Sequence, residues 1–515
     1  MRAGPGSAAT VATGRFSLDR DSRRLPAATP ALAPLAAVLR AFSPRFAART
    51  VTWRSRSIYI AVVAFWLFAL FGAWRFSGIW AWSAGLMYVV YDTLLLVHVA
   101  RKTTYLLAPA PAGAGSAVGE TSLAVVIAAR NEAGALPGTV ERLLQQEDAA
   151  DEVVIVDDGS TDGTAEVLAG RYAMAPDAAG QWRSATHPAL RLLRVGAGGK
   201  ARALNVGLGA TRSEVVLTVD ADTELGPGAV RAMRRAFAAD RSLVAACGVL
   251  TPRCAGGAMA ALFQWFQTYE YVRAFISRLA WMRSGCLLLV SGAFAGFRRE
   301  ALLLVGGFDE DCLVEDYEVI HRLHRYAHER GADWRVEVVG EARATTDAPG
   351  SLLGFLRQRR RWFGGFLQTQ YWNRDMTASA RFGTLGTVML PIKALDTMQP
   401  VYGLTAFVLL VWFGATGQLR VFLPVAVVIG VKIVIDLLFY LWWVRLYARW
   451  LGEALTGHRL MMAALAALAE PFSFQLLRHS GAVWGWHAFL TRSGSWGHAG
   501  PTGSPPAVRM PPRPA

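Results

Sequence analysis

Runs of apolar residues long enough to cross a lipid bilayer lie near both ends of the chain. Two of them, Ile58–Trp74 and Ile79–Ala100, precede a less hydrophobic middle, and Val401–Ala415 and Val421–Val444 follow it. A helix of about 20 apolar residues matches the thickness of the hydrocarbon core. Together with a hydrophobic fraction of 53%, these runs exclude an ordinary soluble enzyme and a disordered chain. They predict a protein with membrane-spanning helices at both ends.

Basic residues beside the apolar runs indicate how the chain lies across the membrane. Arg54 and Arg56 precede the first run, and Arg101 and Lys102 follow the second. Because cytosolic flanks are enriched in Lys and Arg, the two runs are expected to form a hairpin with both ends in the cytosol. The same bias accounts for the net charge of +15, since the sequence has no nucleic-acid-binding motif. We expect a multi-pass protein of the inner or plasma membrane that contacts membrane lipid and no nucleic acid.

Changes in composition divide the chain into five expected segments. They are a mostly disordered basic tail over residues 1–50, a transmembrane hairpin over 51–107, a cytosolic domain over 120–385, C-terminal transmembrane and interfacial helices over 386–490, and a disordered tail over 491–515. Within the fourth segment, Glu470-Pro471 interrupts the apolar run Leu460–Leu477, and Ala482–Leu490 is a further short membrane segment.

Cysteine and histidine spacings give no sign of a zinc site. The four cysteines contain no CxxC pair. Scattered cysteines also suit a reducing compartment, which favours a cytosolic middle domain. His321, His324 and His328 are spaced to share one helix face. A solvated or packed face is favoured there over a metal-binding stripe.

From Ser122 onward, short β-branched runs alternate with amphipathic stretches. The expected strands are Leu123–Ile127, Glu152–Val156, Leu190–Val195 and Glu214–Val219, and the expected helices are Leu136–Gln146, Gly163–Ala169 and Ala201–Gly209. This alternation implies an α/β domain with a mostly parallel sheet and crossover helices. Such sheets bind ligands at the carboxyl ends of their strands, so the residues directly after each strand are the candidate site residues.

Polar residues follow several of these strands. Asp220 and Asp222 close one strand, where two carboxylates can jointly bind a hard divalent cation such as Mg²⁺, although Asp-x-Asp is also a common turn. Asp157 and Asp158 follow another strand and can accept hydrogen bonds from a nucleoside. The alternative is a helix cap, because Ser160 is a good N-cap residue.

Gly198-Gly199-Lys200 opens the helix Ala201–Gly209. Flexible backbone, a cation and a helix N-terminus all suit a diphosphate. The spacing is not that of a nucleotide triphosphatase P-loop. Taken alone, the motif is more typical of a turn.

Two later motifs carry charged groups that suit catalysis. Glu315-Asp316 begins an amphipathic helix, where a carboxylate serves either as an N-terminal cap or as a general base. Gln358, Arg361 and Trp362 belong to a basic cluster that suits a diphosphate and a stacked sugar ring. The alternative is a juxtamembrane basic helix on anionic lipid.

Lys432 and Asp436 lie four residues apart inside a predicted span. We expect them to pair, because ionisable groups at that depth are costly when isolated. The pair fits equally well as part of a polar path and as a purely structural contact.

The chain resembles the inverting, membrane-embedded processive glycosyltransferases of family 2, which include poly-N-acetylglucosamine, hyaluronan, chitin and cellulose synthases. The resemblance covers roughly residues 55–490 and rests on five motifs that occur in the family's order: Asp157-Asp158-Gly159, Gly199-Lys200, Asp220-Ala221-Asp222, Glu315-Asp316 and Gln358-x-x-Arg361-Trp362. One departure is Val314, where the family usually has Thr before Glu-Asp.

This resemblance implies a nucleotide-sugar-binding domain of the GT-A type, inserted between the membrane segments. It implies that Asp157 and Asp158 hold the uridine and that Lys200 lies near the nucleotide. It also implies that Asp220 and Asp222 bind UDP and its divalent cation, Mg²⁺ or Mn²⁺.

On the acceptor side, the resemblance implies that Asp316 deprotonates the acceptor hydroxyl. Arg361, within the motif that begins at Gln358, steadies the diphosphate, and Trp362 lines the acceptor site. The expected activity is inverting transfer from a UDP-sugar to a growing β-linked polysaccharide, with an N-acetylglucosamine-type polymer favoured and export across the membrane.

Other functions remain open from the sequence alone. The alternative enzyme transfers a single sugar to a membrane lipid and makes a glycolipid. Accessory export subunits are further candidate partners. A transporter or scaffold with an inactive transferase fold is disfavoured, because the full set of carboxylates is retained.

Overall fold

The computed structural model describes residues 32–46, 49–75, 83–108, 121–178, 180–418 and 422–491. The predicted C-terminal tail and most of the predicted N-terminal tail fall outside these ranges. Inside the N-terminal segment, helix α1 (Leu32–Phe42) differs from the predicted disorder. Leu35 and Leu39 are buried and α1 contacts α9 and α6. Tertiary packing therefore orders a stretch whose composition is typical of a tail.

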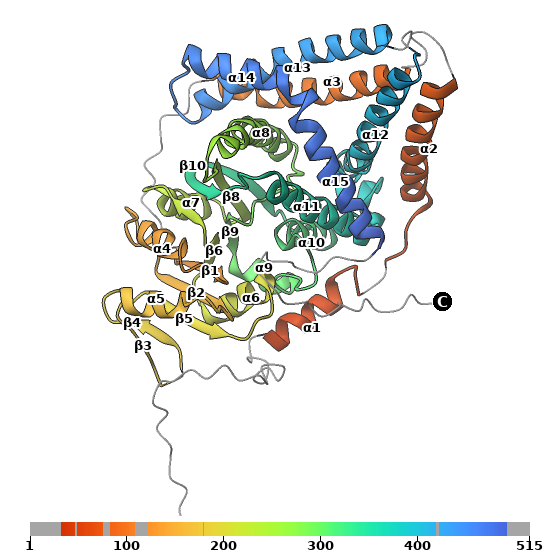
Figure 1. Ribbon diagram of the computed structural model, residues 1–515. Helices are drawn as coiled ribbons and strands as arrows, with labels where there is room; N and C mark the ends of the chain where they lie inside the picture. The colour runs from red at the N-terminus through yellow and green to blue at the C-terminus, as the bar shows by residue number, and fades with distance from the viewer. Residues whose placement is uncertain are drawn as a thin grey trace, which may run out of the picture.

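One mixed sheet of ten strands forms the centre of the middle domain (Figure 1). Its order is β3-β4-β5-β2-β1-β6-β9-β8-β10-β7. The strands are β1 (Leu123–Ala129), β2 (Glu152–Asp158), β3 (Met174–Pro176), β4 (Trp182–Ser184), β5 (Leu190–Val195), β6 (Val215–Asp220), β7 (Thr223–Leu225), β8 (Leu243–Arg253), β9 (Phe294–Arg298) and β10 (Arg335–Asp347).

The parallel core of this sheet confirms the predicted α/β fold. β5, β2, β1 and β6 are parallel neighbours, and all four were expected from the sequence. Residues Leu123–Ile127 of β1 are fully buried, because a central parallel strand is covered on both faces. Fully burying one Val, Leu or Ile side chain stabilises a fold by about 1.5–3 kcal/mol. β9 pairs antiparallel with both β6 and β8 and extends the sheet beyond the expected strands.

Short helices connect the strands and cover the sheet. They are α4 (Leu136–Leu144), α5 (Thr164–Arg171), α6 (Lys200–Ala210), α7 (Ala229–Ala239), α9 (Arg299–Val305) and α10 (Glu315–Arg330). α6 contacts β1 and β2, whereas α7 contacts β8 and β10. The three predicted crossover helices correspond to α4, α5 and α6.

Longer helices run along the top and the right of the sheet domain in Figure 1. They are α2 (Trp53–Arg75), α3 (Ser83–Thr103), α8 (Ala258–Arg283), α11 (Leu352–Trp372), α12 (Leu390–Ala415), α13 (Phe422–Trp450), α14 (Gly457–Ala469) and α15 (Phe474–Leu490). α3 and α13 pack against each other and against α8, and α15 packs along α11 (Figure 1). Helices α8 and α11 therefore join the sheet domain to the apolar helices.

Two helices in the described part of the chain are long and apolar enough to cross a membrane, Leu385–Ala415 and Phe422–Trp450. A third crossing is reached if Gly457–Phe472 and Phe474–Leu490, which meet at a 50° bend, form one broken span. The bend coincides with the predicted interruption at Glu470-Pro471. The N-terminal runs form α2 and α3, which contact each other; the hairpin they were expected to make across a membrane stays a prediction.

Cysteine labelling tests the predicted topology. Arg381 is exposed on the sheet-domain side of α12, and Gln418 is exposed in the connection between α12 and α13. If α12 and α13 cross the membrane as a hairpin with a cytosolic middle domain, Arg381→Cys stays unlabelled by an impermeant maleimide added to intact cells. Gln418→Cys is the matched control and is labelled. Labelling of Arg381→Cys from outside contradicts this orientation.

Candidate active site

The carboxyl ends of the parallel strands bring the predicted acidic residues to one edge of the sheet. Ala129 of β1 pairs with Asp157 of β2, and Ala128 pairs with Asp220 of β6. Residues separated by more than 60 positions in sequence therefore lie two strands apart. This edge is the binding edge expected for a doubly wound sheet.

Asp157 and Asp158 organise the backbone at this edge. Asp158 accepts hydrogen bonds from the amides of Gly198 at 2.7 Å and Gly199 at 2.8 Å. Burial raises the pKa of Asp158, and the two amides partly offset that effect. The amide of Ser160 donates to Asp157 at 3.0 Å. Asp158 thereby fixes the Gly198–Gly199 turn, for which the sequence left both a diphosphate site and a plain turn open.

The capping alternative for this region is not observed. Gly163 occupies the N-cap position of α5, and no side chain caps that helix. Ser160 Oγ instead accepts a hydrogen bond from the amide of Asn131 at 2.9 Å. The loop after β2 is therefore tied to the loop after β1.

Lys200 links the sheet edge to the helix that carries the predicted base. Its Nζ lies 2.5 Å from Asp220 Oδ1 and 3.2 Å from Glu315 Oε1. Burial lowers the pKa of Lys200, but Asp220, Glu315 and Asp316 outweigh burial and leave its pKa raised. The ammonium therefore stays protonated and holds these carboxylates together.

Asp222 lies in a strongly negative part of the site. Burial, together with Asp220 and Asp347, raises the pKa of Asp222 to about 6. Burial, and then Asp222 and Asp220, raise the pKa of Glu132 to about 7. No role was assigned to Glu132 from the sequence. A carboxylate three residues past the end of β1 was the available signal.

Asp316 lies at the start of α10 and faces the cavity described below. Its Oδ2 accepts a hydrogen bond from the amide of Gly292 at 2.7 Å. A Cβ on Gly292 would lie 3.0 Å from the same oxygen, so the close approach favours glycine there. Burial, and then Glu315, raise the pKa of Asp316 to about 6, while Lys200 opposes them. Val314 is the N-cap of α10 and makes no side-chain cap bond.

A cavity of about 670 Å³ joins this edge to the long helices. At the sheet end its lining includes Lys200, Asp220, Asp222, Glu315 and Asp316, and along α11 it includes Gln358, Arg361 and Trp362. The structure therefore brings together all of the predicted site residues except Asp157 and Asp158, which lie beside the cavity on β2.

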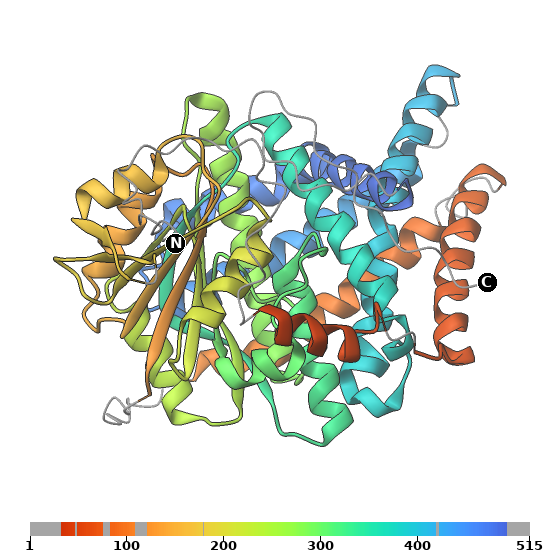
Figure 2. The same ribbon diagram turned by 90° about the horizontal axis from the view of Figure 1, so that it is seen from below.

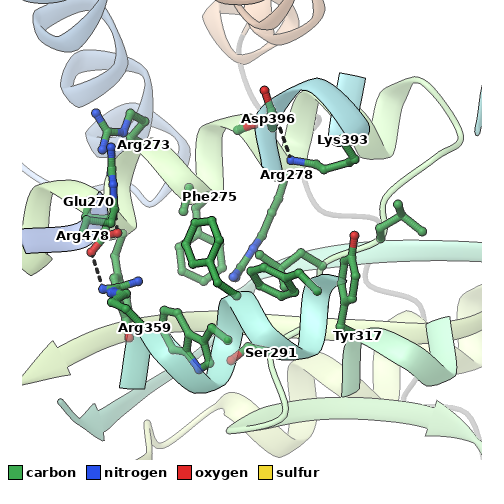
Figure 3. A pocket seen from close by; sticks show the side chains of 18 of the residues that line it. Glu270, Arg273, Phe275, Arg278, Ser291, Tyr317, Arg359, Lys393, Asp396 and Arg478 are labelled. Carbon is green, nitrogen blue, oxygen red and sulfur yellow. Dashed lines mark hydrogen bonds and ion pairs between the residues drawn. The ribbon is translucent and has the colours of Figure 1, made fainter. Parts of the chain in front are cut away.

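Charged pairs line the middle of the cavity, as Figure 3 shows. Arg359 Nη2 lies 2.7 Å from Glu270 Oε2, and the Arg359 guanidinium stacks over the Trp362 ring at 4.3 Å. Arg273 Nη2 lies 2.7 Å from Glu470 Oε1. Glu270 and Arg273 come from α8. Nothing in the sequence indicated that this helix contributes to the cavity.

The far end of the cavity lies among the apolar helices. Lys432 pairs with Asp436, as expected, and its Nζ also lies 2.9 Å from Asp92 Oδ2 on α3. Lys393 Nζ lies 3.2 Å from Asp396 Oδ2 (Figure 3). All five side chains line the cavity, so the expected pairing is confirmed and the pair faces the cavity.

Two of the three histidines of α10 are packed, and His328 is exposed. The Nδ1 of His321 lies 2.9 Å from the carbonyl of Tyr317, and the Nε2 of His324 lies 2.8 Å from the carbonyl of Leu287. Burial lowers the pKa of His321 to about 3 and that of His324 to about 4, so both stay neutral. The packed alternative is confirmed for these two residues.

Comparison with known families matches most of the described sheet domain and the helices after it. Residues 124–304 match the model of glycosyl transferase family 2, and residues 215–477 match that of glycosyl transferase family group 2. A solved structure with some similarity is the mannosyltransferase PcManGT from Pyrobaculum calidifontis in complex with GDP-Man and Mn²⁺. It is 21% identical, covers 82% of this chain and 99% of its own, and gives a TM-score of 0.49.

Curated relatives include two kinds of synthase. The β-monoglucosyldiacylglycerol synthase of Synechocystis sp. is 28% identical over 309 residues, which are 57% of this chain and 58% of the relative. The poly-β-1,6-N-acetyl-D-glucosamine synthase of Staphylococcus epidermidis is 28% identical over 281 residues, 54% of this chain and 62% of the relative. The chain thus spans about three fifths of the length of these relatives. Since one family model covers residues 215–477 of 515, the chain belongs to glycosyltransferase family 2, and its sheet domain is of the α/β class.

Proposed function

We propose that the chain transfers a sugar, with inversion, from a UDP-sugar to the end of a growing β-linked polysaccharide and helps to export the product. An N-acetylglucosamine-type polymer is favoured. The observation that carries the proposal is the single cavity that joins Asp316 and the Asp220–Asp222 edge to the charged pairs among the apolar helices. An acceptor in that cavity has its reacting end at the sheet edge and its other end among the apolar helices.

Asp316 serves as the general base in this proposal. Its pKa of about 6 keeps it ionised at neutral pH while giving it more basicity than an exposed aspartate, which suits proton abstraction. Each carboxylate oxygen has two lone pairs, and the amides of Gly292 and Tyr317 use one on each. The remaining lone pairs can take the proton of the acceptor hydroxyl. The hydroxyl oxygen then attacks the anomeric carbon, whose bond to UDP breaks on the opposite face.

The donor is assigned to the sheet edge. Asp157 and Asp158 hold the uridine beside the turn that Asp158 orders, and Lys200 keeps Asp220 in place near the nucleotide. Arg361 and Gln358 on α11 face the departing diphosphate, and Trp362 forms the wall of the acceptor site. Support for this assignment is the placement of the last three residues in one cavity with Asp220.

Asp220 and Asp222 fit a divalent cation, Mg²⁺ or Mn²⁺. Mutual repulsion and burial raise the pKa of Asp222 to about 6, and a bound cation relieves that repulsion. Among the described residues no group of three or more His, Cys, Asp or Glu is placed to hold a metal. Two carboxylates completed by substrate phosphate oxygens are a set that Mg²⁺ accepts. When bound, such an ion stabilises the charge of the leaving diphosphate.

A lipid acceptor is the second candidate. Helices α3, α12 and α13 contribute residues to the cavity wall, so a lipid hydroxyl can reach Asp316 from the apolar helices. The similarity to a β-monoglucosyldiacylglycerol synthase points the same way. The two candidates share the donor site and the base, and they differ in product size.

Incubation of membranes with labelled UDP-sugars tests the proposal directly. We expect incorporation of one UDP-sugar, UDP-N-acetylglucosamine first, into material that stays at the origin of a lipid thin-layer plate and shrinks on glycosidase treatment. A single labelled species that migrates as a glycolipid favours the lipid acceptor. No transfer from any UDP-sugar contradicts the proposed donor.

Asp316→Asn tests the general base. Asparagine can still accept the Gly292 amide but cannot take a proton. We expect normal amounts of protein, near-normal UDP binding and a loss of sugar transfer by roughly 10²–10⁴. Glu315→Gln is the neighbouring control. We expect a milder effect on sugar transfer, because the Glu315 carboxylate contacts Lys200 and is not the group proposed to take the proton of the acceptor hydroxyl. If Asp316→Asn keeps more than about a tenth of wild-type turnover, its activity is far above the residual activity expected without a general base. That result places the base elsewhere.

Metal removal tests the carboxylate pair. Chelator abolishes transfer and added Mg²⁺ or Mn²⁺ restores it. Asp222→Asn lowers transfer by about 10³ or more, a loss of the size expected when several kcal/mol of charge stabilisation disappear. Asp333→Asn, at an exposed aspartate far from the cavity lining, keeps wild-type activity. If the wild type keeps full activity in chelator, Asp220 and Asp222 do not bind a metal that transfer needs.

A further inference from the structure

The loop that leads into Asp316 has no regular structure of its own. Residues 306–314 connect α9 to α10. Asn205 holds the start of the loop, because its side chain donates to the carbonyl of Phe308 and accepts from the amide of Phe308, both at 2.8 Å. The next residues, Asp309 to Asp311, are acidic and would repel one another without a cation. The position of Asp316 therefore depends on what holds this acidic stretch.

Arg45 supplies that cation from the N-terminal segment. Its Nη1 lies 2.5 Å from Asp309 Oδ1, and its Nη2 pairs with Asp311. The Asp309 side chain is 1% exposed and that of Arg45 is 15% exposed. A buried carboxylate needs a charged partner, so this contact is a fixed part of the fold.

The same loop is also held by α11. Gln368 Nε2 donates to the carbonyl of Asp311 and Gln368 Oε1 accepts from the amide of Leu313, both at 3.1 Å. The Arg45 guanidinium also lies 5.4 Å from the ring centroid of Trp372, the last residue of α11. Arg45 and Gln368 together clamp the loop against the helix that carries Arg361 and Trp362.

The N-terminal segment contacts this loop in two ways. Leu35 and Leu39 of α1 are buried, and Leu39 lies against Gly306 at the start of the loop. Beside the acidic stretch a cavity of about 150 Å³ remains, lined by residues of α1, by Arg45 and by Asp309 to Asp311. There the Arg45 ion pairs make the contact. α1 itself lies against α9, close to the loop (Figures 1 and 2).

We propose that Arg45 is a positioning residue for sugar transfer, which fixes the Asp309–Asp311 stretch and through it sets the Asp316 carboxylate against Gly292 and the acceptor hydroxyl. This inference rests on the proposed role of Asp316. Arg45 lies outside both regions matched by the family models, residues 124–304 and 215–477. The chain thus uses the segment that precedes its first long helix to order its catalytic loop.

Arg45→Gln tests the inference in the purified full-length chain. Glutamine removes the charge that both aspartates share. We expect kcat for transfer from the UDP-sugar that gives product to fall by about tenfold to a hundredfold, the loss expected from a small displacement of a catalytic group. The KM for that UDP-sugar and the affinity for UDP stay within about twofold, because the donor edge is untouched. Arg45→Lys restores part of kcat.

The matched control is Arg40→Gln, which removes the same charge from an exposed position in α1 and keeps wild-type kinetics. Two results overturn the positioning role. One is a loss of kcat in Arg40→Gln as large as that in Arg45→Gln. The other is a change in KM in Arg45→Gln that is as large as its change in kcat. If Arg45→Gln does not fold, Asp311→Asn breaks the exposed half of the same bridge. Full kcat in that variant, or failure of both variants to fold, also overturns the inference.

Asp316→Asn separates this inference from the proposed function. An active Asp316→Asn enzyme contradicts the proposed base. An inactive Asp316→Asn enzyme together with a fully active Arg45→Gln enzyme contradicts the role of Arg45 alone.

Discussion

The ammonium of Lys200 is the contact that joins the two halves of the candidate site. One half is the carboxyl edge of the parallel sheet, which carries Asp220, and the other is the N-terminus of α10, which carries Glu315 and Asp316. Lys200 Nζ contacts Asp220 and Glu315 at once. Lys200 is the first residue of α6 and directly follows the turn that Asp158 fixes. The edge of the sheet and the start of α10, which come from distant parts of the sequence, are thereby held in one geometry.

Burial gives the two carboxylates of this site related properties. The pKa of Asp316 and that of Asp222 are both raised to about 6, in each case mainly by burial and by a neighbouring carboxylate. The consequences differ because the surroundings differ. Lys200 opposes the shift at both groups, but only one carboxylate, Glu315, raises the pKa of Asp316 beside burial, and Lys200 contacts that carboxylate. In the proposed mechanism Asp316 is therefore available as an anion and a base. Asp222 has Asp220 and Asp347 beside it, so excess negative charge there suits a divalent cation.

Local patterns in the sequence predict the nucleotide half of the site well. Alternating apolar runs place β1, β2, β5 and β6, and the acidic residues after them then share an edge by topology alone. The other half depends on contacts that no local pattern encodes. β9 inserts antiparallel between β6 and β8, and this pairing places Gly292, two residues before β9, beside the end of β6. Glu270 and Arg45 belong to segments without a recognisable motif, and their partners lie 89 and 264 residues away.

The proposed role of Asp316 as the base accounts for the close packing of the sheet domain against the apolar helices. A carboxylate with a raised pKa keeps that property only while bulk water is excluded. The Asp316 end of the cavity is walled by α8, α11 and the loop before α10, and α15 backs α11 along its length. An acceptor that fills the cavity completes this exclusion at the moment of transfer. In the proposed mechanism the acceptor is therefore the substrate and also completes the wall of the site. The far end of the acceptor then lies beside the charged side chains of Arg359 and Lys432, which line the cavity.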